Sequence, residues 1–359
     1  MKTYFKIITL VSCIGAFFIL FNNCSGPSSS YVEEEPNDAQ DSSVVSKQCL
    51  SSPLEVCSLT NSCQNGTQQW TVSSDLPSCF QDGAAFNFRD ASSELRYYCR
   101  YKPIVGGSKK PLIIWLHGGS GSAENLYKAT QLRAKAERDQ FHIVALQSRN
   151  LKLNLARLSD GHHFDTWQWD FAADTKNGDI QALDQLIDLL VQQGDVDTSR
   201  IYLMGWSEGG MLAQLYGLIR HHTASVYGHK VAAVVVYSGS SPFHRKYENN
   251  TECTPDLKFQ SQLPISSYSR TCDVVTCNKQ QETDLWSKGS FADVIDMQSW
   301  KDILKNGISN NNVVHTLLDK DGNVAGACAQ TCSLTSATLN HLTWPLSFEE
   351  QMLTYLFNQ

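Results

Sequence analysis

The fold of this chain is decided by Ile201-Tyr-Leu-Met-Gly-Trp-Ser207-Glu-Gly-Gly-Met211. Its first residues form an apolar run that predicts a buried strand, and residues 211–220 carry a helical pattern. A strand, the pentapeptide Gly-x-Ser-x-Gly and a helix, in this order, are typical of a nucleophile elbow, a tight turn that lifts a serine hydroxyl out of a sheet. The helix N-terminus behind the serine favours a developing oxyanion. The stretch therefore predicts Ser207 as a nucleophile; the alternative is a glycine-rich loop with an incidental serine.

Apolar runs and helical patterns alternate along the whole chain. Strands are predicted over residues 84–89, 95–101, 112–116, 141–146, 201–204, 231–237, 264–268 and 313–318. Helices are predicted over residues 180–191, 211–220 and 348–356. Fully apolar strands that alternate with helices indicate a mostly parallel sheet with helices on both faces. The fold class is therefore α/β, and its first two strands pair around a polar turn.

A serine hydroxyl needs a histidine base, and that histidine needs a carboxylate that fixes its tautomer. On a nucleophile-elbow fold the acid and then the base follow the serine along the chain, and each lies at the C-terminal end of a strand. His341 is predicted as the base, in a loop between the last strand and the last helix. Asp273 follows the penultimate strand and is predicted as the acid. Its rivals in the following loop and helix are Asp284, Asp293 and Asp296.

Two backbone N–H groups are needed to hold an oxyanion. One is expected from Glu208, the residue after the serine. The other is expected from Gly119 in the loop His117-Gly-Gly-Ser-Gly121, where glycine allows a close approach of the backbone. A phosphate-binding loop is the alternative for this segment, but it has neither a Gly-Lys-Ser/Thr ending nor the full dinucleotide spacing.

Three segments together resemble a known family. They are Pro111-Leu-Ile-Ile-Trp-Leu-His-Gly-Gly119, the block 179–211 with its lead-in Asp197-Thr-Ser-Arg-Ile-Tyr202, and His341-Leu-Thr-Trp-Pro345. From residue 96 to residue 359 the chain resembles the secreted polyhydroxybutyrate-depolymerase-like and feruloyl- or acetyl-esterase-like branch of the α/β-hydrolases. It departs from that branch at the acid, where Arg270-Thr-Cys-Asp273 stands in place of Gly-x-x-Asp, and at Leu342, one residue more than His-x-Trp-Pro.

The resemblance implies hydrolysis of carboxylic esters through an acyl-enzyme, with no metal or organic cofactor. Ser207 would attack, His341 would move the proton, Asp273 would orient His341, and Gly119 and Glu208 would hold the oxyanion. The resemblance also implies an aromatic wall for an aryl, sugar or polyester group, and plain core packing is the alternative for each of its members. The tryptophans concerned are Trp167, Trp169, Trp206 and Trp344.

The N-terminus is expected to direct export. Residues 1–23 carry two lysines and then an apolar stretch, the pattern of a signal peptide. Cys24 resembles the lipid-modified cysteine of bacterial lipoproteins, although Asn23 departs from the usual small residue; an ordinary secretory signal or an uncleaved anchor is the alternative. Residues 24–48 are polar and predict a disordered tether. A cysteine-rich extension with the first strands then covers 49–100, and the catalytic domain covers 101–359.

Cysteine usage agrees with export. The chain has twelve cysteines, and ten remain when Cys13 and Cys24 in the leader are set aside. An even number in an exported chain predicts up to five disulfides. The short spacings of Cys272 with Cys277 and of Cys328 with Cys332 lead us to expect a bridge within each pair, and a metal site is the alternative.

The charge pattern limits the partners. The net charge of −7 is spread along the chain without a basic block, which argues against nucleic acid or an anionic membrane surface as the main partner. The predicted partner is an ester substrate, with polymeric esters among the candidates, and the membrane is reached through a lipid anchor only. A serine peptidase on the same fold and a binding protein on a decayed hydrolase scaffold are the alternatives.

Overall fold

The computed structural model describes most of the chain from residue 68 onward. The described residues are 68–71, 76–91, 93–104, 107–153, 161–164, 166, 177–242, 246–247, 251–252, 261–277, 297–307, 309–329 and 332–359. The predicted signal peptide, Cys24, the tether and residues 49–67 of the cysteine-rich extension lie outside these residues. Trp167 and Trp169 and the rival acids Asp284, Asp293 and Asp296 also lie outside the described residues.

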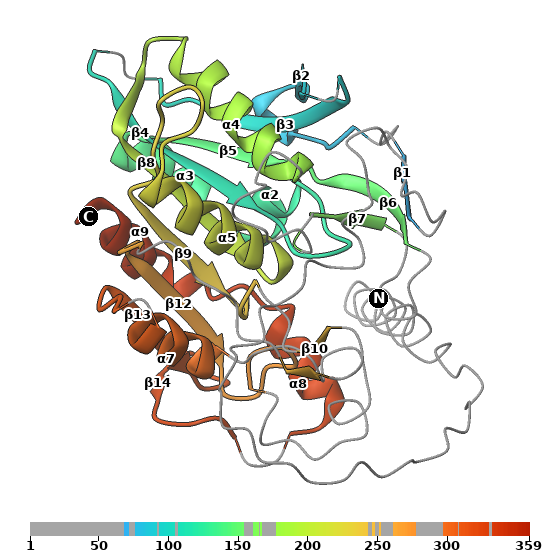
Figure 1. The fold of residues 1–359 in the computed structure, drawn as a ribbon, viewed down its shortest axis with the longest axis vertical. Coiled ribbons are helices and arrows are strands. Elements are labelled where there is room, and N and C mark those ends of the chain that lie inside the picture. The colour runs from blue at the N-terminus through green and yellow to red at the C-terminus, as the bar shows by residue number, and fades with distance from the viewer. Residues whose placement is uncertain are drawn as a thin grey trace, which may run out of the picture.

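Nine of the described strands form one sheet, in the order β14-β13-β12-β9-β8-β4-β5-β3-β2 (Figure 1). Their bounds are β2 Phe86–Arg89, β3 Leu95–Tyr101, β4 Lys110–Leu116, β5 His142–Leu146, β8 Val196–Trp206, β9 Ala233–Tyr237, β12 Ile265–Arg270, β13 Val313–Leu318 and β14 Val324–Ala325. The strands from β5 to β13 pair in parallel, and the antiparallel pairs lie toward the edges, at β2 with β3, β3 with β5 and β13 with β14. The predicted mostly parallel sheet and its N-terminal hairpin are confirmed.

Two small sheets accompany the large one. In the first, β6 (Arg149–Leu153) lies between β1 (Gln68–Thr71) and β7 (Gly161–His163), and all pairs are antiparallel. In the second, β10 (Lys246–Tyr247) pairs with β11 (Thr251–Glu252). Because β6 begins just after β5 ends, the first small sheet extends from the C-terminal end of the central strands.

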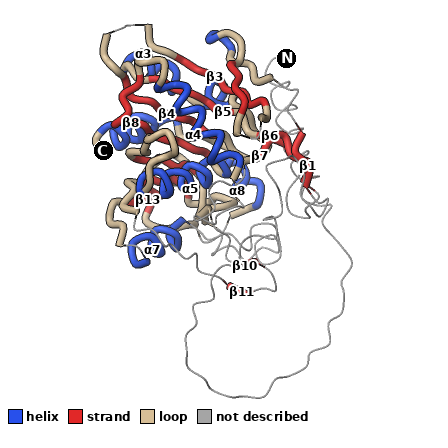
Figure 2. The backbone as a smooth tube through the Cα atoms, turned by 45° about the horizontal axis from the view of Figure 1, so that its top comes forward, coloured by secondary structure: helices blue, strands red, loops and turns tan. Residues whose placement is uncertain are grey.

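Helices cover both faces of the large sheet, as Figures 1 and 2 show. One face packs against α4 (Gly178–Val191), α5 (Glu208–His222) and α7 (Met297–Gly307). The other packs against α2 (Asn125–Ala129), α3 (Leu132–Asp139) and α9 (Glu349–Phe357). Along β4, residues 112, 114 and 116 enter the first core and residues 113 and 115 enter the second, because successive side chains of a strand point to opposite faces.

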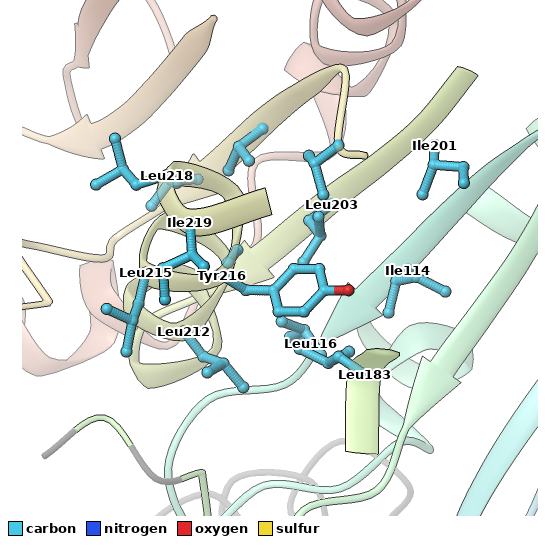
Figure 3. Close-up of a cluster of buried hydrophobic side chains, with 14 of the residues drawn as sticks. Ile114, Leu116, Leu183, Ile201, Leu203, Leu212, Leu215, Tyr216, Leu218 and Ile219 are labelled. Carbon is cyan, nitrogen blue, oxygen red and sulfur yellow. The ribbon is translucent and has the colours of Figure 1, made fainter. Parts of the chain in front are cut away.

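The first core fixes α5 tightly against the sheet. Figure 3 shows Tyr216 of α5 among Leu203 of β8, Leu116 of β4 and Leu183 of α4. The Tyr216 hydroxyl donates to a carboxylate oxygen of Asp184 at 2.8 Å, and that carboxylate also accepts two hydrogen bonds from Arg220. Because α5 is anchored in this way, the residue at its N-terminus, Ser207, is held in a fixed position.

Two exposed turns lie at the N-terminal end of the parallel strands, opposite to the end where β8 meets α5. α4 returns to β8 through Gly194 (φ 86°), and the loop from α5 to β9 turns at Gly228 (φ 85°), where the left-handed backbone favours glycine. A Cβ placed at either glycine meets nothing within 4 Å, so these turns are open to solvent. Of the helices among the described residues, none combines the length and the apolar character needed to cross a bilayer.

Candidate active site

The predicted elbow forms at the junction of β8 and α5. Ser207 has φ 53° and ψ −121°, a strained backbone conformation for a residue with a side chain. A Cβ on Gly205 would lie 2.2 Å from the carbonyl oxygen of Gly209, and a Cβ on Gly209 would lie 2.3 Å from that of Leu116. No other residue fits at those two places without a backbone shift, which is the physical reason for glycine on both sides of the serine.

The structure brings Ser207, His341 and Asp273 together in one line of hydrogen bonds. The Nε2 atom of His341 lies 2.8 Å from Ser207 Oγ, and its Nδ1 atom lies 3.2 Å from Asp273 Oδ1. His341 is the last residue of α8 (Leu334–His341), so its predicted place in a loop is wrong. The helix forms because the Ser333 side chain caps it by accepting the N–H of Ser336 at 3.1 Å.

Asp273 is fully buried, and every contact it makes suits a carboxylate. Its Oδ1 atom accepts the N–H groups of Val275 at 2.7 Å and Thr276 at 3.1 Å, and Oδ2 accepts the hydroxyl of Ser238. Burial alone would raise the pKa of Asp273, but the charge of His341 and these hydrogen bonds outweigh it and hold that pKa below its usual value. The acid is therefore kept ionised beside the imidazole.

Two side chains hold the backbone around His341. Trp206 donates its indole N–H to the carbonyl of His341 at 2.9 Å. The Tyr237 hydroxyl lies 2.8 Å from the carbonyl of Asn340 and 2.6 Å from that of Thr343. The base is thus tied to the ends of β8 and β9, next to the elbow.

Trp206 and Trp344, which were expected to line the substrate site, are buried in the core, as the alternative of plain core packing predicts. Their exposed fractions are 7% and 4%, and their rings pack on each other and on Tyr237. Trp344 donates its indole N–H to Glu349 at 2.8 Å. Because both indole N–H groups find partners inside, the two rings are satisfied in the core beneath the base.

The glycine loop after β4 lies against the elbow. A Cβ on Gly118 would lie 3.2 Å from Ser207 Cβ, so this residue passes directly beside the serine. The carbonyl of Gly118 accepts from Gly121 N–H at 2.9 Å and lies 2.7 Å from His117 Nδ1. In a trans peptide the C=O and the following N–H point in opposite directions, so the N–H of Gly119 points away from these partners. Its assignment to the oxyanion hole, like that of Glu208, stays a prediction.

His117 sets the orientation of that peptide. It is fully buried, its Nε2 atom accepts the N–H of Ser148 at 3.1 Å, and its proton therefore resides on Nδ1 and points at the Gly118 carbonyl. Burial lowers the pKa of His117 to about 3, because an imidazolium would be desolvated there. The ring is a neutral donor at any ordinary pH.

The side chain of Glu208 and the residue His163 are functional candidates that the sequence analysis missed. The Glu208 carboxylate accepts the N–H of Phe164 at 3.1 Å and lies 3.1 Å from His163 Nδ1. A Cβ on Gly119 would lie 3.3 Å from both the carboxylate and the ring. The N–H of Ser120 donates to the carbonyl of His162 at 2.7 Å. β7 thus closes the outer side of the glycine loop. His163 ends a strand of only three residues, which is too short to give a sequence pattern that would find it.

The disulfides also correct the sequence analysis. Cys272 bonds to Cys332 and Cys277 to Cys328, so neither expected short-range bridge forms. The pairing crosses because β12 and β13 are parallel neighbours, and the segments that follow them meet at one edge of the sheet. A third bridge, Cys79–Cys99, joins the segment before β2 to β3.

The chain is similar in sequence to known esterases. Residues 104–277 match a family model described as Phospholipase/Carboxylesterase. Feruloyl esterase B of Thermothelomyces thermophilus is 25% identical over 42% of this chain and 46% of its own length. A bifunctional acetylxylan esterase/xylanase of Neocallimastix patriciarum is 27% identical over 40% of this chain and 18% of its own length. The chain thus spans about half or less of the curated relatives it matches.

Among solved structures, a poly(3-hydroxybutyrate) depolymerase from Bordetella parapertussis is 13% identical, covers 66% of this chain and 84% of its own, and has a TM-score of 0.43. The fold rests on the strand order and on the family match over residues 104–277, and not on this likeness. The chain has the α/β-hydrolase fold, and its sequence is similar to that of esterases with this fold.

Proposed function

We propose that this protein is a serine esterase that hydrolyses carboxylic esters through an acyl-enzyme. The observation that carries the proposal is the hydrogen-bonded line from Ser207 through His341 to Asp273, with contacts of 2.8 and 3.2 Å. Nucleophile and base lie within hydrogen-bond reach, and a buried carboxylate orients the base, as acyl transfer requires.

The reaction follows from these positions. Ser207 Oγ attacks the ester carbonyl while its proton passes to His341 Nε2, and Asp273 stabilises the imidazolium that forms. The N–H groups of Gly119 and Glu208 donate to the oxyanion. His341 then gives the proton to the leaving alkoxide, which departs as the alcohol and leaves the acyl group on the serine. Water, deprotonated by His341, releases the acid and restores Ser207.

The names of the relatives guide the choice of substrate. Feruloyl esterase and acetylxylan esterase point to an aryl or acetyl ester on a carbohydrate. A polyester is the alternative substrate.

We also propose that the protein is exported and held at the cell envelope through Cys24. Three disulfides among the described residues support an oxidising compartment. Two acyl chains at Cys24 would hold the enzyme at a membrane surface, whereas one chain would bind only marginally. Cys24→Ala should release active protein into the soluble fraction or block its maturation. A mature N-terminus beyond Cys24 without an acyl mass would contradict the anchor.

The experiment that tests the activity is a substrate panel on wild type and Ser207→Ala. It contains p-nitrophenyl acetate, methyl ferulate, acetylated xylan, polyhydroxybutyrate and a peptide anilide. Wild type should hydrolyse the esters and react with a fluorophosphonate, and Ser207→Ala should lose several orders of magnitude in kcat, because the three residues act as a unit. Ser199→Ala, at the exposed end of the same strand, is the matched control. Cleavage of the anilide with no ester hydrolysis would identify a peptidase, and an inactive, unlabelled wild type would identify a binding protein.

A further inference from the structure

The acid and the base of the proposed site come from two segments that the chain keeps far apart. Asp273 lies in residues 271–277, here named the acid loop, which follows β12. His341 ends α8, whose cap Ser333 directly follows Cys332. Cys272, the neighbour of Asp273, is bonded to Cys332, and Cys277 at the end of the acid loop is bonded to Cys328. Both bridges therefore join the segment of the acid to the segment that leads into the base.

Few other contacts connect these segments. Besides the contact of His341 with Asp273, the described hydrogen bonds between them run from Asn340 Nδ2 to the Cys272 carbonyl at 3.0 Å, from Val274 N–H to the Ala337 carbonyl at 3.3 Å and from Ala329 N–H to the Thr271 carbonyl at 2.6 Å. The apolar cluster between them is small and separate from both main cores. Its buried members are Met211, Cys272, Val274, Val275 and Ala337.

α8 has little stability of its own. It is eight residues long, and isolated helices of that length are marginal in water. The side chain of Leu339 in its last turn is 36% exposed, so this helix buries little apolar surface. The elbow, in contrast, stands between two elements that are packed in the main core. Loss of the bridges would therefore loosen the acid loop relative to α8 and leave Ser207 in place.

We propose that the two bridges are a clamp that sets the position of the acid against the base, which makes Cys272, Cys332, Cys277 and Cys328 positioning residues for catalysis. The inference rests on the proposed function of the triad. The distance of 3.2 Å from His341 Nδ1 to Asp273 Oδ1 is near the upper limit for a hydrogen bond, so a small displacement would break it. A misplacement of about 1 Å lowers the rate about 10²-fold. Trp206 and Tyr237 tie the base to the ends of β8 and β9, and Ser238 gives the acid one hydrogen bond beside the end of β9. The clamp therefore sets the spacing between acid and base.

The test compares bridge variants of the full chain. Cys272→Ala with Cys332→Ala, Cys277→Ala with Cys328→Ala, and all four together remove the clamp in steps, and alanine leaves no free thiol. Cys79→Ala with Cys99→Ala is the matched control, because it removes a bridge from another part of the sheet. Each variant is assayed for kcat and KM on p-nitrophenyl acetate, well below its own Tm.

The fourfold variant should lose about 10- to 100-fold in kcat with KM nearly unchanged, and each single-bridge variant should lose less. The control should keep its kcat despite a lower Tm. A folded fourfold variant with wild-type kcat would overturn the clamp. So would a control that loses as much activity at an equal loss of Tm. If the fourfold variant does not fold, the two single-bridge variants decide in the same way.

A second readout separates the clamp from the proposed function. Hydrogen exchange at the amides of Val275 and Thr276, which donate to Asp273, should accelerate in the clamp variants and not in the control. Unchanged exchange would overturn the clamp even if the enzyme had no esterase activity. Inactive wild type together with accelerated exchange would reject the esterase and keep the clamp as a structural device.

Discussion

Asp273→Asn isolates the charge of the acid from its geometry. The Oδ1 atom of Asp273 faces three donors, two of them the backbone N–H groups of Val275 and Thr276. These groups can only donate, so they hold the amide oxygen of an asparagine at that position. Its NH₂ group then faces Ser238, whose hydroxyl can turn and accept. We expect the asparagine variant to keep the correct tautomer of His341 and to lose only the negative charge.

The magnitude follows from the electrostatics of that pair. A carboxylate about 4 Å from an imidazolium, at an effective dielectric constant of about 20, is worth about 4 kcal/mol. At 1.36 kcal/mol per factor of ten in rate, kcat should fall by about 10³. The kcat of Asp273→Ala should fall further, because this change also removes the acceptor of His341 Nδ1 and leaves two buried N–H groups without a partner.

The assay is kcat for p-nitrophenyl acetate, with the Tm of each variant measured alongside. Ser238→Ala is the control, because it removes one hydrogen bond to the carboxylate and leaves its charge; it should stay within about tenfold of wild type. A kcat of Asp273→Asn within about tenfold of wild type would refute the charge argument, and equal losses in the asparagine and alanine variants would refute the retained geometry. If Asp284→Asn or Asp293→Asn abolishes activity while Asp273→Asn does not, the acid is another residue.

Three further predictions concern the elbow, the glycine loop and its pH dependence. Gly209→Ala should destabilise the fold by about 1–3 kcal/mol and lower kcat, because its Cβ would lie 2.3 Å from the Leu116 carbonyl oxygen. Chemical denaturation and the ester assay measure the two effects. Gly326→Ala is the control and should be neutral, because a Cβ there has open space around it. Glu208→Ala should lower kcat about 10- to 100-fold, and Glu208→Gln, which keeps an acceptor for Phe164 N–H, should recover most of it; full activity of the alanine variant would show that the carboxylate does not hold the loop. His117 stays neutral in the folded state, whereas its imidazole in the unfolded chain is protonated below about pH 6.5. Acidification to pH 5 should therefore lower the free energy of unfolding by up to about 2 kcal/mol. Urea titrations of His117→Gln should show a flatter pH dependence than those of wild type.

The parts of the molecule that depend on local pattern are predictable from the sequence. The elbow is one, because two glycines, one serine and the flanking strand and helix are contiguous. The positions of Asp273 and His341 after particular strands are another, because parallel strands bring their C-terminal ends to one edge of the sheet.

What could not be predicted depends on which loops meet in space. The crossed disulfides follow from the adjacency of β12 and β13, and cysteine spacing does not report that adjacency. α8 could not be predicted because its sequence, Leu-Thr-Ser-Ala-Thr-Leu-Asn-His, is poor in strong helix formers. The helix depends on its serine cap. Nor does the size of an aromatic ring reveal whether it faces substrate or core, and Trp206 and Trp344 face the core.

The open turns at Gly194 and Gly228 lie at the end of the sheet opposite to the elbow. No residue of the candidate site comes from them, and both are exposed with room around the backbone. A peptide tag or a short linker inserted at Gly228 should therefore leave the hydrolytic chemistry untouched. Attachment of the enzyme to a bead through that turn would orient every molecule with its serine facing outward, toward an insoluble plant fibre or a plastic film.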